Sequence, residues 1–129
     1  MFEKLEITRM AQALASHAGT RMGIVAGNTA NADTPGYKAR DLPDFARTYS
    51  GMRQGEGQRA TRPGHINSPA RNMQPEPEIQ QGPASVNGNT VSLEGEMVRA
   101  ADIRQQQDLA LSVYRSSASI LRLALGRGR

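Results

Sequence analysis

Hydrophobic residues recur with a helical period at the N-terminal end of the chain. Over residues 1–32 the apolar side chains are three, four or seven positions apart, and polar residues such as Arg9 and Arg21 lie between them. Because an α-helix has 3.6 residues per turn, these spacings place the apolar side chains on one face. The pattern predicts an N-terminal helix over residues 1–32. Its apolar face consists of Ile7, Ala11, Leu14, Ala18, Met22, Val25 and Ala32.

A second stripe on this predicted helix has a small residue at every fourth position. Each glycine inside a helix costs roughly 0.8–1 kcal/mol relative to alanine, so this stripe weakens the isolated helix. Glycine has no Cβ, and a neighbouring backbone can therefore approach closely. We expect the three glycines to pack against another helix; the alternative is a loose helix with incidental glycines. The stripe consists of Ala11, Ala15, Gly19, Gly23 and Gly27.

The C-terminal part of the chain has a stricter pattern, in which spacings of four and three alternate. This heptad pattern is typical of a coiled coil. Ser92 is a suitable N-cap, and Glu94 and Glu96 lie in the first turn, where the helix dipole favours negative charge. We expect a helix over residues 92–129; an ordinary surface helix is the alternative. The predicted seam consists of Leu93, Met97, Ala100, Arg104, Gln107, Leu111, Tyr114, Ala118, Leu121 and Leu125.

Between the two predicted helices the helical period is lost. Residues 51–90 contain 11 glycines and prolines, a composition typical of low-order sequence. We expect a long, irregular, variable and flexible loop over residues 51–91, with short extended segments near Ile79 and Val86. A loop of this length indicates a functional segment or one that a partner orders.

These elements predict a mainly α protein. The long N- and C-terminal helices are expected to pack as an antiparallel coiled-coil hairpin, with the apolar face of residues 1–32 against the C-terminal seam. Two helices alone leave apolar surface uncovered. A second apolar set on the C-terminal helix, together with the glycine stripe, therefore predicts contacts with helices of other subunits. This second set is Leu109, Val113, Ile120 and Leu123.

Residues 25–41 combine helix-ending and turn-forming residues. Thr34 precedes a proline and is disfavoured in the α conformation, and Pro35 fixes its own φ. Pro35 and Gly36 suit the two central positions of a type II turn. Nearby asparagine side chains can bond backbone groups that are freed where a helix ends. The string therefore predicts a helix end followed by a tight turn.

This string resembles the signature of bacterial flagellar axial proteins, the family of rod, hook and hook-associated subunits. In that family an Asn-x-Ala-Asn-x-x-Thr-Pro-Gly-Tyr element follows the first helix. The residues after it, and a second string over residues 88–97, are most similar to proximal rod proteins of the FlgB type. We assign residues 33–50 to the turn and the extension of this signature. The matching assembly-signature residues are Asn28, Ala30, Asn31, Thr34, Pro35, Gly36 and Tyr37.

The resemblance implies a structural subunit of the proximal rod of the flagellar basal body. Such subunits polymerise through their terminal helices into the tubular drive shaft that crosses the periplasm, and they are exported without a cleaved signal peptide. The implied partners are other copies, other rod subunits, the rod-to-ring adaptor, the inner-membrane ring and the type III export gate. No direct membrane insertion is expected. Phe45 and Tyr49 are implied as an export-gate segment, with simple loop anchoring as the alternative.

The composition of the chain excludes several kinds of chemical site. The chain has 129 residues, no cysteine and two histidines, which excludes disulfides, a thiol nucleophile and Cys-type zinc sites. His17 and His65 are isolated, so we expect neither a catalytic nor a metal site, and no cofactor. We expect His17 to lie in a helix interface. The N-terminal segment contains two glutamates and does not fit a Sec-type signal.

Nucleic-acid binding is the alternative function. Residues 46–72 contain five arginines and a single acidic residue, Glu56. A flexible basic arm of this kind can bind phosphates. Aromatic residues for base stacking are nearly absent from this stretch, and a basic loop can equally dock on acidic neighbours. The arginines are Arg47, Arg53, Arg59, Arg62 and Arg71.

Overall fold

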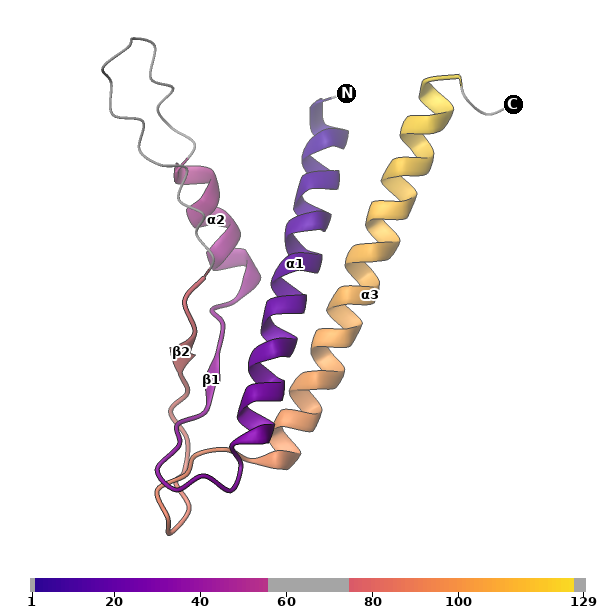
Figure 1. Ribbon diagram of the computed structural model, residues 1–129. Coiled ribbons are helices and arrows are strands. Elements are labelled where there is room, and N and C mark those ends of the chain that lie inside the picture. The colour runs from indigo at the N-terminus through magenta and orange to yellow at the C-terminus, as the bar shows by residue number, and fades with distance from the viewer. Residues whose placement is uncertain (1, 56–74, 127–129) are drawn as a thin grey trace.

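Two long helices dominate the structure. The computed structural model describes residues 2–55 and 75–126; residues 1, 56–74 and 127–129 lie outside the described part. Helix α1 spans Phe2–Ala30 and helix α3 spans Leu93–Ala124, and the two pack against each other (Figure 1). The prediction of a mainly helical chain with packed terminal helices is therefore confirmed. The predicted ranges, 1–32 and 92–129, extend a few residues beyond the helix ends.

The end of α1 lies beside the start of α3. Asn28, near the end of α1, hydrogen-bonds to Glu96 in the first turns of α3. Ala11, in the first half of α1, lines a pocket of about 160 Å³ with Ala110 and Tyr114 of α3. Figure 1 shows that the first turn of α1 and the last turn of α3 point to the same end of the molecule.

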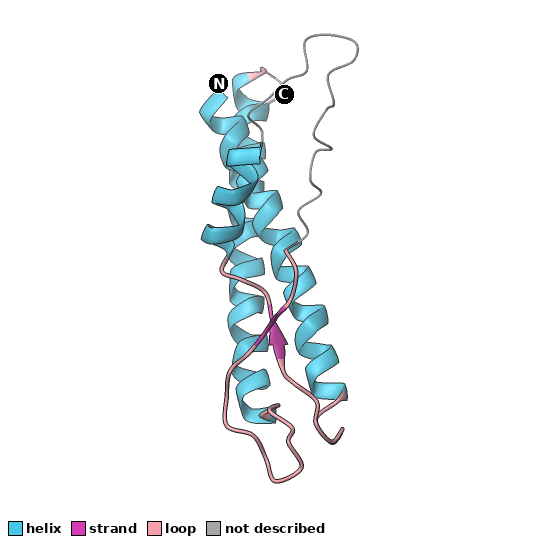
Figure 2. Ribbon diagram, turned by 90° about the vertical axis from the view of Figure 1, so that its left-hand side faces the viewer, coloured by secondary structure: helices cyan, strands magenta, loops and turns pink. Residues whose placement is uncertain are grey.

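Three shorter elements lie between the long helices in sequence. Strand β1 (Arg40–Asp41) pairs antiparallel with strand β2 (Glu78–Ile79), with Arg40 opposite Ile79. Helix α2 spans Phe45–Gly55. Figure 1 places α1 between α3 on one side and this small layer on the other, and Figure 2 views the molecule from the side of that layer. Helix α1 is therefore the central element.

Helix α2 differs from the expectation for this region. The sequence pattern assigns residues 33–50 to a turn and an extension and begins the loop at residue 51, whereas the helix continues to Gly55. Phe45 and Tyr49 are four residues apart and so lie on one face of α2, where Tyr49 stacks on Phe45 and Phe45 contacts His17 of α1; these contacts favour the helical conformation. Val86 also differs, because it lies in a turn closed by the Gly88 amide and the Ser85 carbonyl, 2.8 Å apart.

The core between α1 and α3 is thin. Ala18 and Ile103 are fully buried, Val25 is almost fully buried, and Met22 and Ala100 pack against them. Among the described residues, Ile103 is the largest apolar side chain that is fully buried. Burying a side chain of this size contributes about 1.5–3 kcal/mol, so the apolar core alone supplies modest stability.

The face that α3 turns toward α1 is rotated relative to the predicted seam. Leu93 and Met97 belong to the predicted seam, but they are 52% and 74% exposed. The buried residues of α3 still recur every seven positions, but they are not the positions that the predicted seam contains. Glu96, at the start of α3, bonds to Asn28 of α1, and this bond sets the rotation of the helix. The buried residues of α3 are Glu96, Ile103 and Ala110.

The remaining packing residues lie on the flanks of the helix pair. Leu14 and Leu121 are half-buried, whereas Leu111 and Tyr114 are more exposed and line the pocket between α1 and α3. The second apolar set stays largely uncovered: three of its members are exposed and Val113 is half-buried. The exposed members are Leu109, Ile120 and Leu123.

The two alanines of the small-residue stripe line the pocket against α3, whereas the three glycines of this stripe are open within the described chain. A Cβ placed on Gly19, Gly23 or Gly27 would meet nothing within 4 Å. The predicted N-cap of α3 is confirmed, because the Ser92 hydroxyl accepts a hydrogen bond from the Gly95 amide at 3.3 Å. Within the described residues, no helix combines the length and the hydropathy needed to cross a membrane.

We expect Ile103→Ala to destabilise the helix pair by about 2–5 kcal/mol, because it removes a fully buried side chain and leaves a cavity. Leu109→Ala on the same helix is the matched control, since Leu109 is exposed. Urea unfolding followed by circular dichroism measures both changes. Equal losses for the two variants would contradict the assignment of the core.

Candidate functional site

The turn after α1 has the predicted shape. The Tyr37 amide donates to the Thr34 carbonyl at 3.3 Å, which closes the turn around Pro35 and Gly36. Gly36 has a φ of +72°, the positive value that a type II turn requires at its third position. The Asn31 side chain supports the helix end, because its Nδ2 donates to the Gly27 carbonyl at 2.8 Å.

Asn89 connects the second family-like string to this turn. Its side chain is buried, with the residue only 2% exposed. Its Oδ1 accepts a hydrogen bond from the Val91 amide at 2.7 Å. Its Nδ2 lies 2.7–3.0 Å from three carbonyl oxygens of the turn that follows α1, two of which also accept a hydrogen bond from a backbone amide. These carbonyls belong to Asn31, Ala32 and Thr34.

The two strings also meet through their backbones. The Gly36 amide donates to the Asn87 carbonyl at 3.0 Å, and the Thr90 amide donates to the Tyr37 carbonyl at 3.0 Å. Gly88 has a φ of +79°, and a Cβ placed on it would lie 3.6 Å from the Gly36 Cα. That distance is an ordinary van der Waals contact, so it is the left-handed conformation that favours glycine at position 88.

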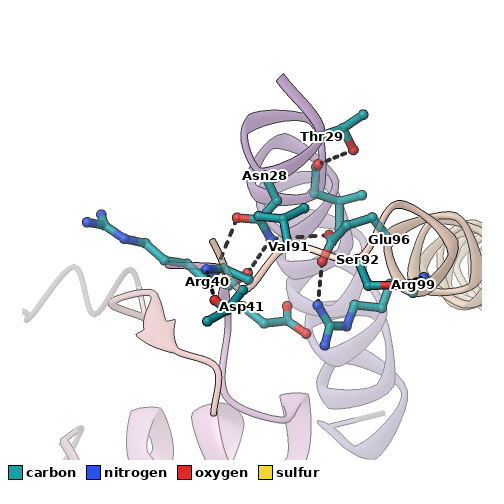
Figure 3. Close-up of polar contacts among 12 residues, drawn as sticks. Asn28, Thr29, Arg40, Asp41, Val91, Ser92, Glu96 and Arg99 are labelled. Atoms are coloured by element: carbon teal, nitrogen blue, oxygen red, sulfur yellow. Dashed lines mark hydrogen bonds and ion pairs between the residues drawn. The ribbon is translucent and has the colours of Figure 1, made fainter. Parts of the chain in front are cut away.

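A second polar cluster joins α1, β1 and α3 (Figure 3). The Asn28 Nδ2 donates to the Arg40 carbonyl at 2.7 Å and to Glu96 Oε2 at 3.2 Å, and its Oδ1 accepts from the Arg40 amide at 3.1 Å. The other Glu96 carboxylate oxygen pairs with the Arg99 guanidinium. Asn28 and Glu96 are 1% and 2% exposed. Because each side chain has partners, the cluster can stay buried.

An ion pair fixes β1 to α1. Arg21 Nε and Nη2 donate to the two carboxylate oxygens of Asp41, both at 2.7 Å. Burial by itself raises the pKa of Asp41, but hydrogen bonds from Arg21 and from the Leu42 amide outweigh it, and the pKa is lowered overall. The ionised pair therefore stabilises the fold at neutral pH, and this contribution is lost as the pH falls through the lowered pKa.

His17 lies between α1 and α2. Its Nε2 donates to the Pro43 carbonyl at 3.0 Å. Its ring meets the Phe45 ring edge-on at 5.7 Å, and the Tyr49 ring stacks on Phe45 at 5.4 Å. The two residues of the predicted export-gate segment are thus half-buried on α2, in contact with α1 or with each other.

The structure brings together some signature residues and adds others. Asn28, Asn31, Thr34, Gly36 and Tyr37 take part in the hydrogen bonds described above, whereas Ala30 and Pro35 are exposed. Sequence reasoning did not select the side chains that complete the junction, although three of them lie within the two family-like strings. These additional residues are Arg21, Asp41, Asn89 and Glu96.

The described residues carry no sign of a metal site. Within that part of the chain no three histidine, aspartate or glutamate side chains gather closely enough to hold an ion. Arg47 forms an ion pair with Glu78 at 3.7 Å. Of the residues proposed for nucleic-acid binding, Arg59, Arg62 and Arg71 lie outside the described residues, as do the Arg53 side chain and the isolated histidine at position 65.

Asn89→Ala should lower the free energy of unfolding by about 1–3 kcal/mol, because it removes the side-chain donor to the Ala32 carbonyl and the acceptor of the Val91 amide. Asn87→Ala is the reference variant, since Asn87 is exposed and its side chain accepts one hydrogen bond, from the Asn89 amide at 3.1 Å, so its loss should be smaller. Urea unfolding measures the two losses. If Asn87→Ala costs as much as Asn89→Ala, the Asn89 side chain does not hold the turn.

Asp41→Asn should cost about 3 kcal/mol at pH 7, because it breaks a buried ion pair. The difference from the unsubstituted chain should persist at pH 5. It should shrink below about pH 4, the ordinary pKa of an unfolded aspartate, as the native carboxylate becomes protonated. Chemical unfolding over a pH series measures this difference. A gap that is constant down to pH 2 would exclude the ion pair as its cause.

Comparison with known proteins identifies the family. No family model matches the chain. Three curated relatives are each named flagellar basal body rod protein FlgB. The Yersinia ruckeri protein is 32% identical over 123 residues, covering 86% of this chain and 89% of the relative. The Escherichia coli K12 protein is 35% identical over 125 residues (87% and 88%), and the Agrobacterium fabrum protein is 26% identical over 129 residues (97% and 96%).

These relatives give no support to the nucleic-acid alternative. Their shared name describes a structural component of the flagellar basal body, not an enzyme. The similarity covers both long helices and the junction between them, the parts of the chain that carry the two family-like strings. The chain belongs to the FlgB family and is a structural subunit of the flagellar basal body rod.

Proposed function

We propose that this rod protein polymerises through α1 and α3 into the proximal part of the tubular drive shaft that crosses the periplasm. The observation that carries the proposal is the apolar and small-residue surface left uncovered on the helix pair. The Gly23 position is open, and Leu109 and Leu123 are exposed on α3. A subunit that completes its packing against neighbours is expected to expose such surface before assembly.

The assembling unit in this proposal is an antiparallel coiled-coil hairpin of α1 and α3. The Asn28–Glu96 bond at one end, and the pocket lined by Ala11 and Ala110 further along, support this arrangement. In this view the signature residues act indirectly. They do not contact a neighbour but hold the two helices in the relative orientation that presents their outer faces.

The partners follow from membership of the rod. They are other copies of the chain, other rod subunits, the rod-to-ring adaptor and the inner-membrane ring. The subunit reaches them by type III export without a cleaved signal peptide. Phe45 and Tyr49 form the export-gate segment, because two aromatic residues four positions apart present one continuous apolar face on α2.

Gly23→Leu should leave folding and export intact and abolish motility. A Cβ at position 23 meets nothing within 4 Å in the described chain, and leucine favours helix more than glycine, so we expect the effect to arise only in the assembly. Gly23→Ala, which adds only a methyl group, is the control and should retain most motility. Swarming and secretion assays in cells that lack the chromosomal copy measure both variants.

Isolation of basal bodies from the same cells should show no incorporated Gly23→Leu subunit. Normal motility with Gly23→Leu would show that the glycine stripe faces no neighbour in the rod. Loss of secretion would instead assign the defect to export and leave the role of the stripe in the rod unsupported.

A further inference from the structure

The contact between α2 and α1 is incomplete at His17. This residue is 7% exposed, and only one of its two ring nitrogens has a hydrogen-bond partner, the Nε2 that donates to Pro43. Within the described residues the Nδ1 atom is buried and unpartnered. A buried polar atom that gives up its hydration without compensation opposes docking. The contact that holds α2 on α1 therefore carries an energetic cost, and this cost favours release of α2.

The other contacts at this end of α2 are weak or exposed. Phe45 packs edge-on against His17, and Tyr49 stacks on Phe45, but both aromatic residues are only half-buried. The ion pair between Arg47 and Glu78 lies at 3.7 Å between exposed side chains, where such pairs contribute little.

The segment just before α2 is held more firmly. Asp41 accepts two short hydrogen bonds from Arg21, which lies one helical turn from His17 on α1. Leu42 is buried beside this pair, and its amide donates to the Asp41 carboxylate at 2.8 Å. The chain thus has a fixed base at β1 and a weakly held helix after it.

We propose that α2 is a detachable arm latched by His17. When α2 is docked, the Phe45–Tyr49 face is turned toward α1. When α2 is released about residues 42–44, that face becomes available to an apolar groove on another protein, in the manner of an amphipathic helix. Resting on the export role proposed above, we identify this partner as the export gate. The latch withholds the segment from the gate once the subunit has folded.

Hydrogen–deuterium exchange on the purified full-length chain tests the latch. In His17→Ala the amides of residues 46–51 should exchange about tenfold faster, while amides near Ala18 and Ile103 keep their protection. Ser16→Ala, an exposed neighbour on α1, is the control and should match the unsubstituted chain. Phe45→Leu leaves α1 unaltered and should also accelerate exchange. No acceleration in either variant overturns the proposal.

Binding of the same folded proteins to the purified cytosolic domain of the export gate tests the partner. His17→Ala should bind about tenfold more tightly than the unsubstituted chain, in step with the exchange rates, and His17→Ala combined with Phe45→Ala should lose binding. Equal binding of the unsubstituted chain and His17→Ala overturns the withholding of the segment. Unchanged binding and export of Phe45→Ala overturns the export role itself, whereas the exchange result still decides the latch.

Discussion

The structure depends on the buried hydrogen bonds that join the end of α1 to the start of α3. Asn28, Asn89 and Glu96 are large, fully buried side chains, and all of them are polar. The apolar core offers a single comparable side chain, Ile103, among the described residues. Apolar packing tolerates small rotations of a helix, whereas a carboxamide or carboxylate loses its partner when the helix turns. Directional bonds therefore set the orientation of the helix pair.

Helix α1 carries different chemistry on its different faces. Ala18 and Val25 face α3, and Arg21 and His17 face β1 and α2. The face with Gly23 is open. Helix α1 thus packs directly against α3, β1 and α2, whereas β2 is held through its pairing with β1. A change in the orientation of α1 would therefore shift α3 on one side and the layer of α2 and β1 on the other.

The ion pairs Arg21–Asp41 and Arg47–Glu78 show how burial determines what an ion pair contributes to stability. Arg21 and Asp41 are largely withdrawn from solvent and bond through two oxygens, so the pair is directional and its loss leaves a buried charge. Arg47 and Glu78 are exposed and 3.7 Å apart, and water and salt screen them. The first pair holds β1 on α1, whereas the second contributes little to holding α2 beside β2.

Local patterns in the sequence determined the existence of the long helices, the N-cap at Ser92 and the turn at Pro35 and Gly36, because each depends on residues that are near neighbours along the chain. The resemblance to the family signature likewise identified the chain as a flagellar rod subunit. The pattern did not determine the phase of α3. That phase depends on the bond between Asn28 and Glu96, which are 68 positions apart.

The sequence predicted His17 at a helix interface, but the tertiary structure alone decided its partners and the role of Asn89. Asn89 bonds carbonyls 55–58 positions away, and His17 bonds a carbonyl 26 positions away. The conformation of α2 was missed for the same reason, since its aromatic face is stabilised by a residue on another helix. Helical periodicity reports which side chains share a face. It does not report which partner covers that face, because this depends on contacts that only the folded chain creates.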